Sequence, residues 1–425
     1  MTTARVTAPP RRPSKAAASK PASKKAASDK DLASRLAVLQ RPLASYYLLL
    51  ASIGLLVAIG FVMVLSASSV RSYSTYHSSY AIAMKQGIFI LIGLPLMWLS
   101  SRLPVRFWRA AGMPLLAFSV AALVVVLVPG IGHGVNGARR WIPVAGPFTV
   151  QPSELAKLGL LLWGADLLVR KQKLLKYWKH IVIPLVPVAG MVSLLVMLEP
   201  DLGTTIVTMA VVLTLLWVVG TPMRVFGLLF SAVLALGSLV AVAEPYRLRR
   251  LVSFTDPCGG MHRLHDGFQA CQGLQALTSG GLLGRGLGAS TEKWTGGLPK
   301  PYTDFVYAIV GEELGLLGTL TVLLLFAVLT YAGFRVAKRT KDPFARLAAS
   351  GITVWIAAQA LVNIGTVVGL LPVTGIPLPL MSYGGSALVL NLMALGLLVS
   401  FARTEPGAEA ALRARRGWLR AKLRR

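Results

Sequence analysis

Residues 46–66 read YYLLLASIGLLVAIGFVMVLS, and this stretch decides the fold class. It carries no charged side chain and is as long as the roughly 20 residues that a helix needs to cross a bilayer. Further apolar runs follow along the chain, at residues 82–100, 110–129, 153–169, 181–198, 202–219, 225–243, 304–333, 347–368 and 386–402. We therefore predict an all-α polytopic membrane protein with about ten transmembrane helices in one membrane domain, residues 46–402.

The composition excludes an ordinary soluble protein. Hydrophobic residues make up 55% of the 425 positions and charged residues only 14%, whereas soluble domains carry about 25% charged residues. The net charge of +28 does not indicate nucleic-acid binding, because the Lys and Arg residues gather in the tails and in alternate connections. Basic segments beside membrane helices are typical of topology signals and of contact with anionic lipid.

The distribution of charge predicts the topology. Basic residues fill the N-terminal tail, the connections near 102–109, 170–179, 224 and 335–346, and the C-terminal tail. By the positive-inside rule, both termini are cytoplasmic. Residues 1–45, rich in Ala, Lys, Ser and Pro, are expected to be a disordered basic tail, and 403–425 a second basic tail. The opposite side then holds a large extracytoplasmic loop between spans 7 and 8, residues 244–303, which is long enough to be functional.

Asp304 is the most informative charge, because an ionisable residue at the edge of a span is a candidate functional group. Thr303 is expected to cap the following helix and to place Asp304 in its first turn, where the helix dipole favours an ionised carboxylate. Such a group would serve as a general base or as a cation ligand. The alternative is a helix cap or a structural ion pair.

Three further charged features each have more than one interpretation. Lys157 lies three residues after Glu154, so the two side chains either pair on one helix face or leave Lys157 to meet Asp304 or a phosphate. Arg140, in an outer loop, would bind either a phosphate or lipid headgroups. The turn Glu199-Pro200-Asp201 would ligate a cation or cap the following span.

The large loop contains three more candidate features. Residues 280–288, GGLLGRGLG, resemble a phosphate cradle but lack the preceding strand, so a re-entrant or lid segment is favoured. Cys258 and Cys271 lie in an oxidising compartment and predict a disulfide, which would contribute about 3 kcal/mol. A zinc site with the intervening His262 and His265 is the alternative.

Together, several ordered segments resemble the SEDS family (shape, elongation, division and sporulation), and its division-type members more than its elongation-type members. They are residues 64–69, 140–142, 151–157, 199–204, 267–269, 280–288, 298–305, 311–315, 375–380 and 382–386, of which 298–305 read LPKPYTDF and 382–386 read SYGGS. The resemblance covers about residues 41–403. Members usually carry an acidic residue and a histidine where this chain has Lys300 and Tyr302.

The resemblance implies an inverting peptidoglycan glycosyltransferase that joins the disaccharides of lipid II and releases undecaprenyl pyrophosphate. Asp304 takes the position of the essential carboxylate. The resemblance also implies a divalent cation, Mg²⁺ or Mn²⁺, as cofactor, with Asp304 as its expected ligand. The positions expected to bind substrate are Lys157, Arg140, Glu154, Gln151, Ser382 and Gly384. The implied partners are a class B penicillin-binding transpeptidase and other division proteins, at the septum of the bacterial cytoplasmic membrane. A lipid II flippase, a non-catalytic division scaffold and an elongation enzyme of the same family are the alternatives.

Overall fold

The structure is a computed structural model that describes residues 42–130, 132–135, 138–145, 148–174, 179–243, 254, 256–259, 267–294 and 296–414. Most of the predicted N-terminal tail, half of the C-terminal tail, and His262 and His265 of the alternative zinc site lie outside these residues.

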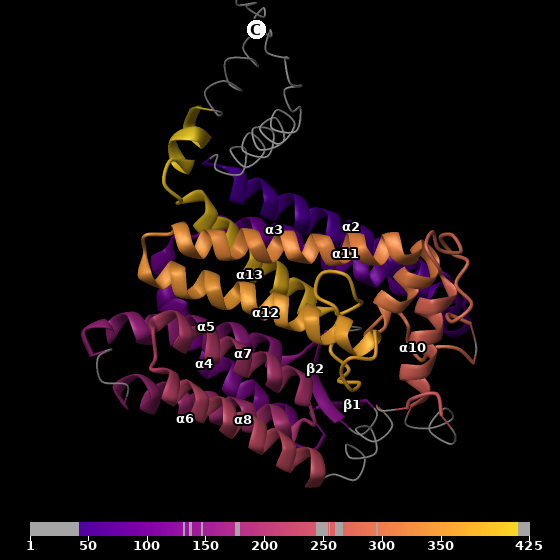
Figure 1. The fold of residues 1–425 in the computed structure, drawn as a ribbon, viewed down its shortest axis with the longest axis horizontal. Helices are drawn as coiled ribbons and strands as arrows, with labels where there is room; N and C mark the ends of the chain where they lie inside the picture. Colours follow the sequence, from indigo (N-terminus) through magenta and orange to yellow (C-terminus); the bar gives the residue numbers. More distant parts are fainter. Residues whose placement is uncertain are drawn as a thin grey trace, which may run out of the picture.

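The described residues form a bundle of long helices that run side by side (Figure 1). Those of at least 18 residues are α2 (Ala44–Tyr76), α3 (Ala81–Arg102), α4 (Val105–Leu127), α5 (Pro152–Arg170), α6 (Lys179–Leu198), α7 (Leu202–Val219), α8 (Met223–Ala243), α11 (Val306–Arg339), α12 (Pro343–Val367) and α13 (Ser386–Arg403). Shorter are η1 (Gln172–Leu174) and α10 (Phe268–Ser279). Within the described part, 7 helices are long and apolar enough to cross a membrane. The predicted all-α polytopic fold is confirmed, while a count of about ten spans stays a prediction.

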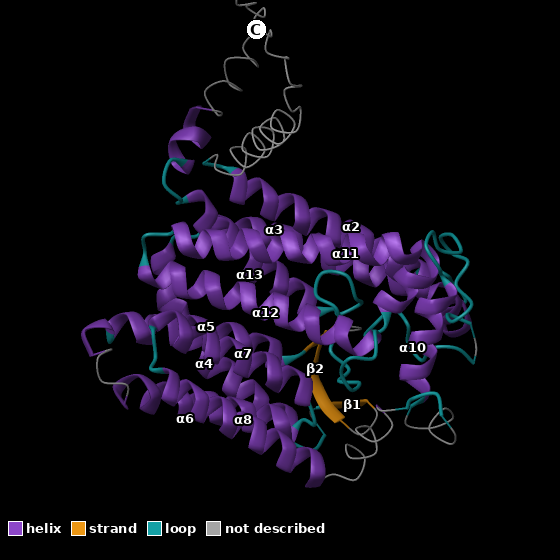
Figure 2. Cartoon of the chain, viewed as in Figure 1, coloured by secondary structure: helices purple, strands orange, loops and turns teal. Residues whose placement is uncertain are grey.

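One outer loop folds differently from the all-α expectation. Residues 130–152 contain three antiparallel strands, β1 (His133–Val135), β2 (Ala138–Ala145) and β3 (Phe148–Val150), in the order β1-β2-β3 (Figure 2). β2 pairs Ile142 with Val150. β1 and β3 have only three residues each, and the eight residues of β2 (ARRWIPVA) lack a regular apolar–polar alternation, so the strands do not stand out from a loop in the sequence. The sheet matters because it positions Arg140, described below.

Basic residues from distant segments meet at the end of the bundle opposite α10. Arg109 Nε of α4 lies 3.0 Å from Asp166 Oδ1 of α5, and Arg170 contacts the same carboxylate. Arg339 at the end of α11 pairs with Glu405, which follows α13, at 3.0 Å. These contacts join α4 to α5 and α11 to the segment after α13, and the predicted charge alternation places all four ends on one side. The assignment of that side to the cytoplasm stays a prediction.

α11 is broken at Gly315, whose φ of 66° and ψ of −163° are not helical. The break removes helical hydrogen bonds, and the glycine-rich segment 280–288 replaces them. Arg285 N donates to Glu312 O (2.9 Å), and Leu316 N donates to Gly281 O (2.9 Å). Backbone polar groups near the membrane must form hydrogen bonds within the protein. Residues 280–288 supply the partners that α11 loses at its break.

The glycines of this segment permit that close approach. A Cβ atom on Gly284 would lie 2.2 Å from Glu313 O, and one on Gly315 would lie 2.3 Å from Gly284 N. The amides of Arg285 and Gly286 are used by the carbonyls of α11. The interpretation of residues 280–288 as a phosphate cradle is therefore wrong, because the amides at its centre already bind backbone.

Candidate functional site

Asp304 lies in a turn that ends directly before α11. Its half-buried carboxylate accepts a hydrogen bond from Thr303 Oγ1 on Oδ1 (2.7 Å), and Gln269 Nε2 of α10 lies 3.5 Å from Oδ2. The helix begins at Val306 with Phe305 at the N-cap position. The prediction that Thr303 caps the helix is wrong, because its hydroxyl binds Asp304 and a neighbouring carbonyl. Asp304 thus stands just ahead of the first turn of α11.

The main chain of Asp304 is held by a buried amide. Asn363 of α12 is 1% exposed, and its Nδ2 donates to Asp304 O and to Ile376 O, both at 2.7 Å. These two bonds tie the turn before α11 to α12 and to the segment that precedes α13. Asp304 therefore sits on a backbone whose position two other elements determine.

Lys157 and Glu154 form a buried ion pair on α5. Lys157 Nζ lies 2.8 Å from Glu154 Oε1, and the side chains are 1% and 3% exposed. Gln359 Oε1 of α12 accepts from the same ammonium at 3.4 Å, and the ring of Trp355 lies 4.9 Å below it. Of the two predicted arrangements, the structure adopts the i,i+3 pair, and no contact between Lys157 and Asp304 occurs among the described residues.

Arg140 of β2 is bound by the acidic turn between α6 and α7. Its Nε donates to Glu199 O (3.0 Å), its Nη2 donates to Pro200 O, and its Nη1 lies 3.7 Å from Asp201 Oδ2. Gln151 Nε2 donates to the same carboxylate oxygen at 3.3 Å. The guanidinium that runs against the topological bias is therefore held by protein carbonyls and a carboxylate, while its binding of a phosphate or of a lipid headgroup stays a prediction.

Asp201 also caps the following helix. Its Oδ1 accepts from the amide of Thr204 at 3.0 Å, and Oδ2 accepts from the Thr204 hydroxyl at 3.0 Å. The capping interpretation of the acidic turn is confirmed, since this is the geometry of an N-cap.

Glu199, in the same turn, is expected to make the stability of the folded protein depend on pH. Burial raises its pKa from 4.5 to about 8, Asp201 adds to the rise, and Arg140 opposes it. The folded protein thus keeps on Glu199 a proton that the unfolded chain releases above pH 4.5. The stability that the protonated Glu199 permits is therefore fully present below pH 4.5 and is lost as the pH rises towards 8. Glu199→Gln, which stays neutral, is expected to gain at least ~1 kcal/mol over the wild type between pH 5 and pH 8.5.

Thermal unfolding of the two purified proteins across that pH range measures the difference. The exposed carboxylate Glu409, whose side chain is 64% exposed, provides the control variant Glu409→Gln, which is expected to follow the wild type at every pH. A gap between Glu199→Gln and the wild type that is constant with pH would contradict the assignment.

Ser382 and Gly384 organise the turn that leads into α13. Ser382 Oγ accepts from Leu378 N (2.9 Å), and its carbonyl accepts from Gln86 Nε2 of α3 (3.2 Å). The carbonyl of Gly384 accepts from Ala387 N at 2.8 Å. Their described contacts are within the protein, and a substrate-binding role for either residue stays a prediction.

Two buried glutamates attach the large loop to α11. Glu312 accepts from Ser290 Oγ (2.6 Å) and from the amide of Thr291 (2.7 Å). Glu313 accepts from Ser66 Oγ of α2 (2.6 Å) and lies 3.4 Å from Lys293 Nζ. These contacts hold the loop on the bundle, and they leave Glu313 Oε2 buried without a hydrogen-bond partner among the described residues.

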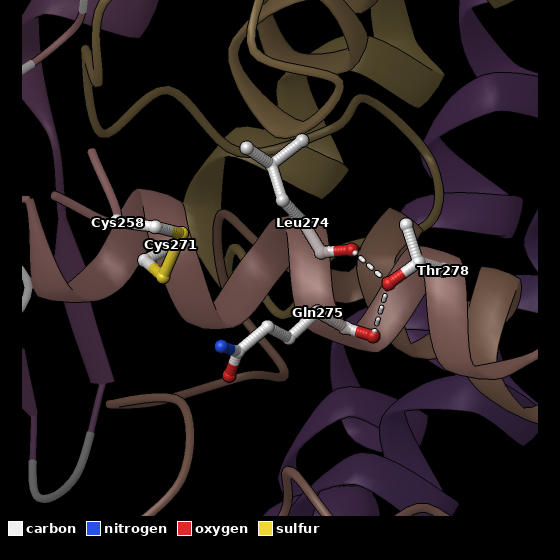
Figure 3. The surroundings of a disulfide bond; sticks show 5 residues. All are labelled: Cys258, Cys271, Leu274, Gln275 and Thr278. Carbon is white, nitrogen blue, oxygen red and sulfur yellow. Dashed lines mark hydrogen bonds between the residues drawn. A yellow bond between two sulfur atoms is a disulfide. The ribbon is translucent and has the colours of Figure 1, made fainter. Parts of the chain in front are cut away.

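A disulfide joins Cys258 to Cys271 in α10, with an S–S distance of 2.03 Å (Figure 3). Two turns further on, Thr278 Oγ1 donates to the carbonyls of Leu274 and Gln275, both at 3.1 Å. The bridge fixes the start of the helix that carries Gln269, which contacts Asp304. No group of three or more His, Cys, Asp or Glu side chains suited to a metal ion occurs in the described part of the chain.

Among the described residues, a divalent cation at Asp304 would therefore have fewer than three such protein ligands. Mg²⁺ is commonly held by one or two carboxylates together with substrate phosphates and waters. The donor set at Asp304 fits a cation that arrives with a phosphorylated substrate, and it does not fit a cage built by the protein alone.

Residues 46–406 match the FtsW/RodA/SpoVE family of cell cycle proteins. The chain belongs to this family. The match spans every long helix of the bundle, and it identifies the chain as an integral membrane protein.

Relatives within the FtsW/RodA/SpoVE family agree in sequence and in fold. A probable peptidoglycan glycosyltransferase FtsW of Mycobacterium tuberculosis is 44% identical over 378 residues, which are 89% of this chain and 71% of the relative. The stage V sporulation protein E of Bacillus subtilis is 39% identical over 82% of this chain and 94% of its own length. RodA of Thermus thermophilus superposes with a TM-score of 0.62 at 30% identity, covering 84% of this chain and 96% of RodA.

A chain in a peptidoglycan synthase complex, described as coordinating polymerization and crosslinking, is also similar. Its TM-score is 0.68 at 31% identity, and the match covers 84% of this chain and 96% of that chain. FtsW/RodA/SpoVE proteins thus share the helix bundle described here.

Two residues next to Asp304 did not emerge as site residues from the sequence. Gln269 belongs to a segment quoted only for its resemblance, and Asn363 lies inside an apolar helix. A buried amide in a membrane helix is a signal in itself, because it requires hydrogen-bond partners. The partners, however, come from segments 59 and 13 residues away, which only the fold brings together.

Proposed function

We propose that this protein is a peptidoglycan glycosyltransferase that polymerises lipid II and releases undecaprenyl pyrophosphate. The observation that carries the proposal is the carboxylate of Asp304, half-buried at the loop end of the bundle on a backbone pinned by Asn363. Family membership and the names of its relatives support the same activity.

Asp304 is the proposed general base. It removes the proton of the acceptor sugar's 4-hydroxyl while that oxygen attacks C1 of the donor sugar. The bond from C1 to the pyrophosphate oxygen breaks, and the electron pair leaves with the undecaprenyl pyrophosphate. Attack opposite the leaving group inverts C1 and gives the β-linkage. Gln269 and Thr303, which contact the two carboxylate oxygens, orient the base.

A divalent cation that enters with the pyrophosphate would neutralise part of the leaving group's charge. Asp304 is the residue proposed to contact it. A class B penicillin-binding transpeptidase is the proposed partner, and the division septum of the bacterial cytoplasmic membrane is the proposed site of action. Contact of the basic tails with anionic lipid is proposed from their sequence alone.

Purified protein in detergent with lipid II tests the activity. We expect glycan strands on a gel, more of them with the transpeptidase present, and fewer when a chelator removes Mg²⁺ and Mn²⁺. A flippase or a scaffold would leave lipid II unpolymerised under every one of these conditions. Absence of polymer with the transpeptidase and both metals supplied would refute the proposed activity.

A further inference from the structure

The two cations that the sequence assigned to the pyrophosphate are both engaged by the protein. Lys157 is buried in its pair with Glu154. Arg140 binds the Glu199 and Pro200 carbonyls and Asp201. A leaving pyrophosphate gains charge as its bond to C1 breaks and needs cations positioned beforehand. The proposed divalent cation would supply part of this charge, and another basic group of the protein near Asp304 would supply the rest.

The outer ends of α2 and α3 carry two cations, the exposed Arg71 and the half-buried Lys85. Lys85 Nζ lies 3.3 Å from the hydroxyl of Tyr76 and 4.5 Å from the centroid of its ring. Neither cation forms an ion pair with a carboxylate among the residues that the structure describes. Both stand on the predicted outer side, against the positive-inside bias, so a ligand on that side accounts for their presence.

A chain of contacts connects this pair to the turn of Asp304. Gln86, next to Lys85 on α3, donates from Nε2 to Ser382 O at 3.2 Å. The amide of the following residue, Tyr383, donates to Tyr302 O at 2.9 Å, and the two rings meet edge to face with centroids 5.8 Å apart. Tyr302 precedes Asp304 by two residues. The outer end of α3 is therefore packed against the segment that carries the proposed base.

The tyrosines at this junction are neutral hydrogen-bond donors. Burial raises the pKa of Tyr383 to about 12, with Tyr302 and Tyr76 adding to the rise. Burial also raises the pKa of Tyr302 above 10.0, and the nearby positive charge of Arg71 opposes that rise. Arg71 thus lies close enough to act on the Tyr302 phenol. Neutral phenols and two cations form a donor set suited to a compact dianion.

We propose that Arg71 and Lys85, with Tyr76 between them, bind the pyrophosphate of the lipid-linked substrate at the outer ends of α2 and α3. The guanidinium of Arg71 matches paired phosphate oxygens, and the ammonium of Lys85 supplies a point charge. The assignment rests on the proposed function, since it names the groups that hold the leaving group of that reaction. A phospholipid headgroup shares the phosphate chemistry and is the competing source.

Native mass spectrometry of the full-length protein tests this site by counting bound undecaprenyl pyrophosphate over a titration. Arg71→Gln and Lys85→Gln are each expected to weaken binding about tenfold, and the double variant about a hundredfold, because a charge-assisted contact is worth roughly a decade in affinity. Arg71→Lys should retain more affinity than Arg71→Gln. The matched control is Arg102→Gln, which removes a cation over the Trp98 ring (5.1 Å) at the opposite end of α3 and should bind like the wild type.

Competition with phosphatidylglycerol separates the two sources of phosphate. Weak displacement supports the pyrophosphate site, whereas displacement at equal concentration overturns it in favour of a general anionic-lipid surface. A correctly folded double variant, judged by its melting temperature, that binds like the wild type also overturns it. Polymerisation is read separately: if the wild type makes no glycan but the binding pattern holds, the proposed function fails and the pyrophosphate site stands.

Discussion

Replacing Asp304 with asparagine is expected to lower the rate of glycan polymerisation by a factor of about 10²–10⁴, the range that a general base contributes. The amide keeps the shape of the side chain and its contact with Thr303, so the folded protein should remain. Polymerisation of lipid II by purified wild type and variant, at matched concentration and with the transpeptidase present, measures the loss. The melting temperature should stay close to that of the wild type, and so should undecaprenyl pyrophosphate binding measured without a divalent cation.

Asp256→Asn is the matched control, because Asp256 is an exposed carboxylate of the same large loop. It should polymerise at the wild-type rate. The pH profile separates a base from a metal ligand: loss of a base removes the acid limb of the wild-type rate profile, while loss of a metal ligand is offset by raising the Mn²⁺ concentration. Wild-type polymerisation by Asp304→Asn would remove this residue from the chemistry.

Glu154→Gln is expected to destabilise the protein by about 3–5 kcal/mol, because it leaves Lys157 as an uncompensated charge inside the bundle. The side chains of the pair are only 1% and 3% exposed, so water cannot replace the lost carboxylate. The drop should appear as a lower temperature of thermal unfolding in detergent. The double variant Glu154→Gln with Lys157→Met should recover part of the loss, since it removes the orphaned charge.

The exposed pair Arg413–Glu409 provides the comparison, with side chains 82% and 64% exposed. Removing either member should leave the unfolding temperature unchanged, as is usual for surface pairs. If Glu154→Gln and the wild type unfold at the same temperature, the Glu154–Lys157 pair does not stabilise the protein in the way that its burial predicts.

Local spacing in the sequence predicts the features that depend on near neighbours. The long apolar runs predict the helices, the three-residue spacing allows the Glu154–Lys157 pair, and Pro200 predicts the turn that Asp201 caps. Each follows from helix geometry or backbone chemistry that acts over a few residues.

Features that depend on the tertiary fold could not be predicted in the same way. Thr303 looked like a helix cap, but the helix starts later, at Val306. Arg140 is held by carbonyls of the turn at Glu199, 59 residues away, and the contact of Asn363 with Asp304 also spans 59 residues. Such long-range partners leave no periodic signal, and main-chain acceptors are present at every residue.

The break at Gly315 divides α11 into two mechanical parts. The carbonyls of Glu312 and Glu313 in the outer part accept from the amides of Arg285 and Gly286, and the amides of Leu316 and Leu317 in the inner part donate to Gly281 and Leu282. Residues 280–286 therefore join the two parts across the break, and local opening of this segment would release both parts from it together. Asp304 stands just before the outer part, so a protein that binds the large loop from outside would act on the carboxylate through these bonds.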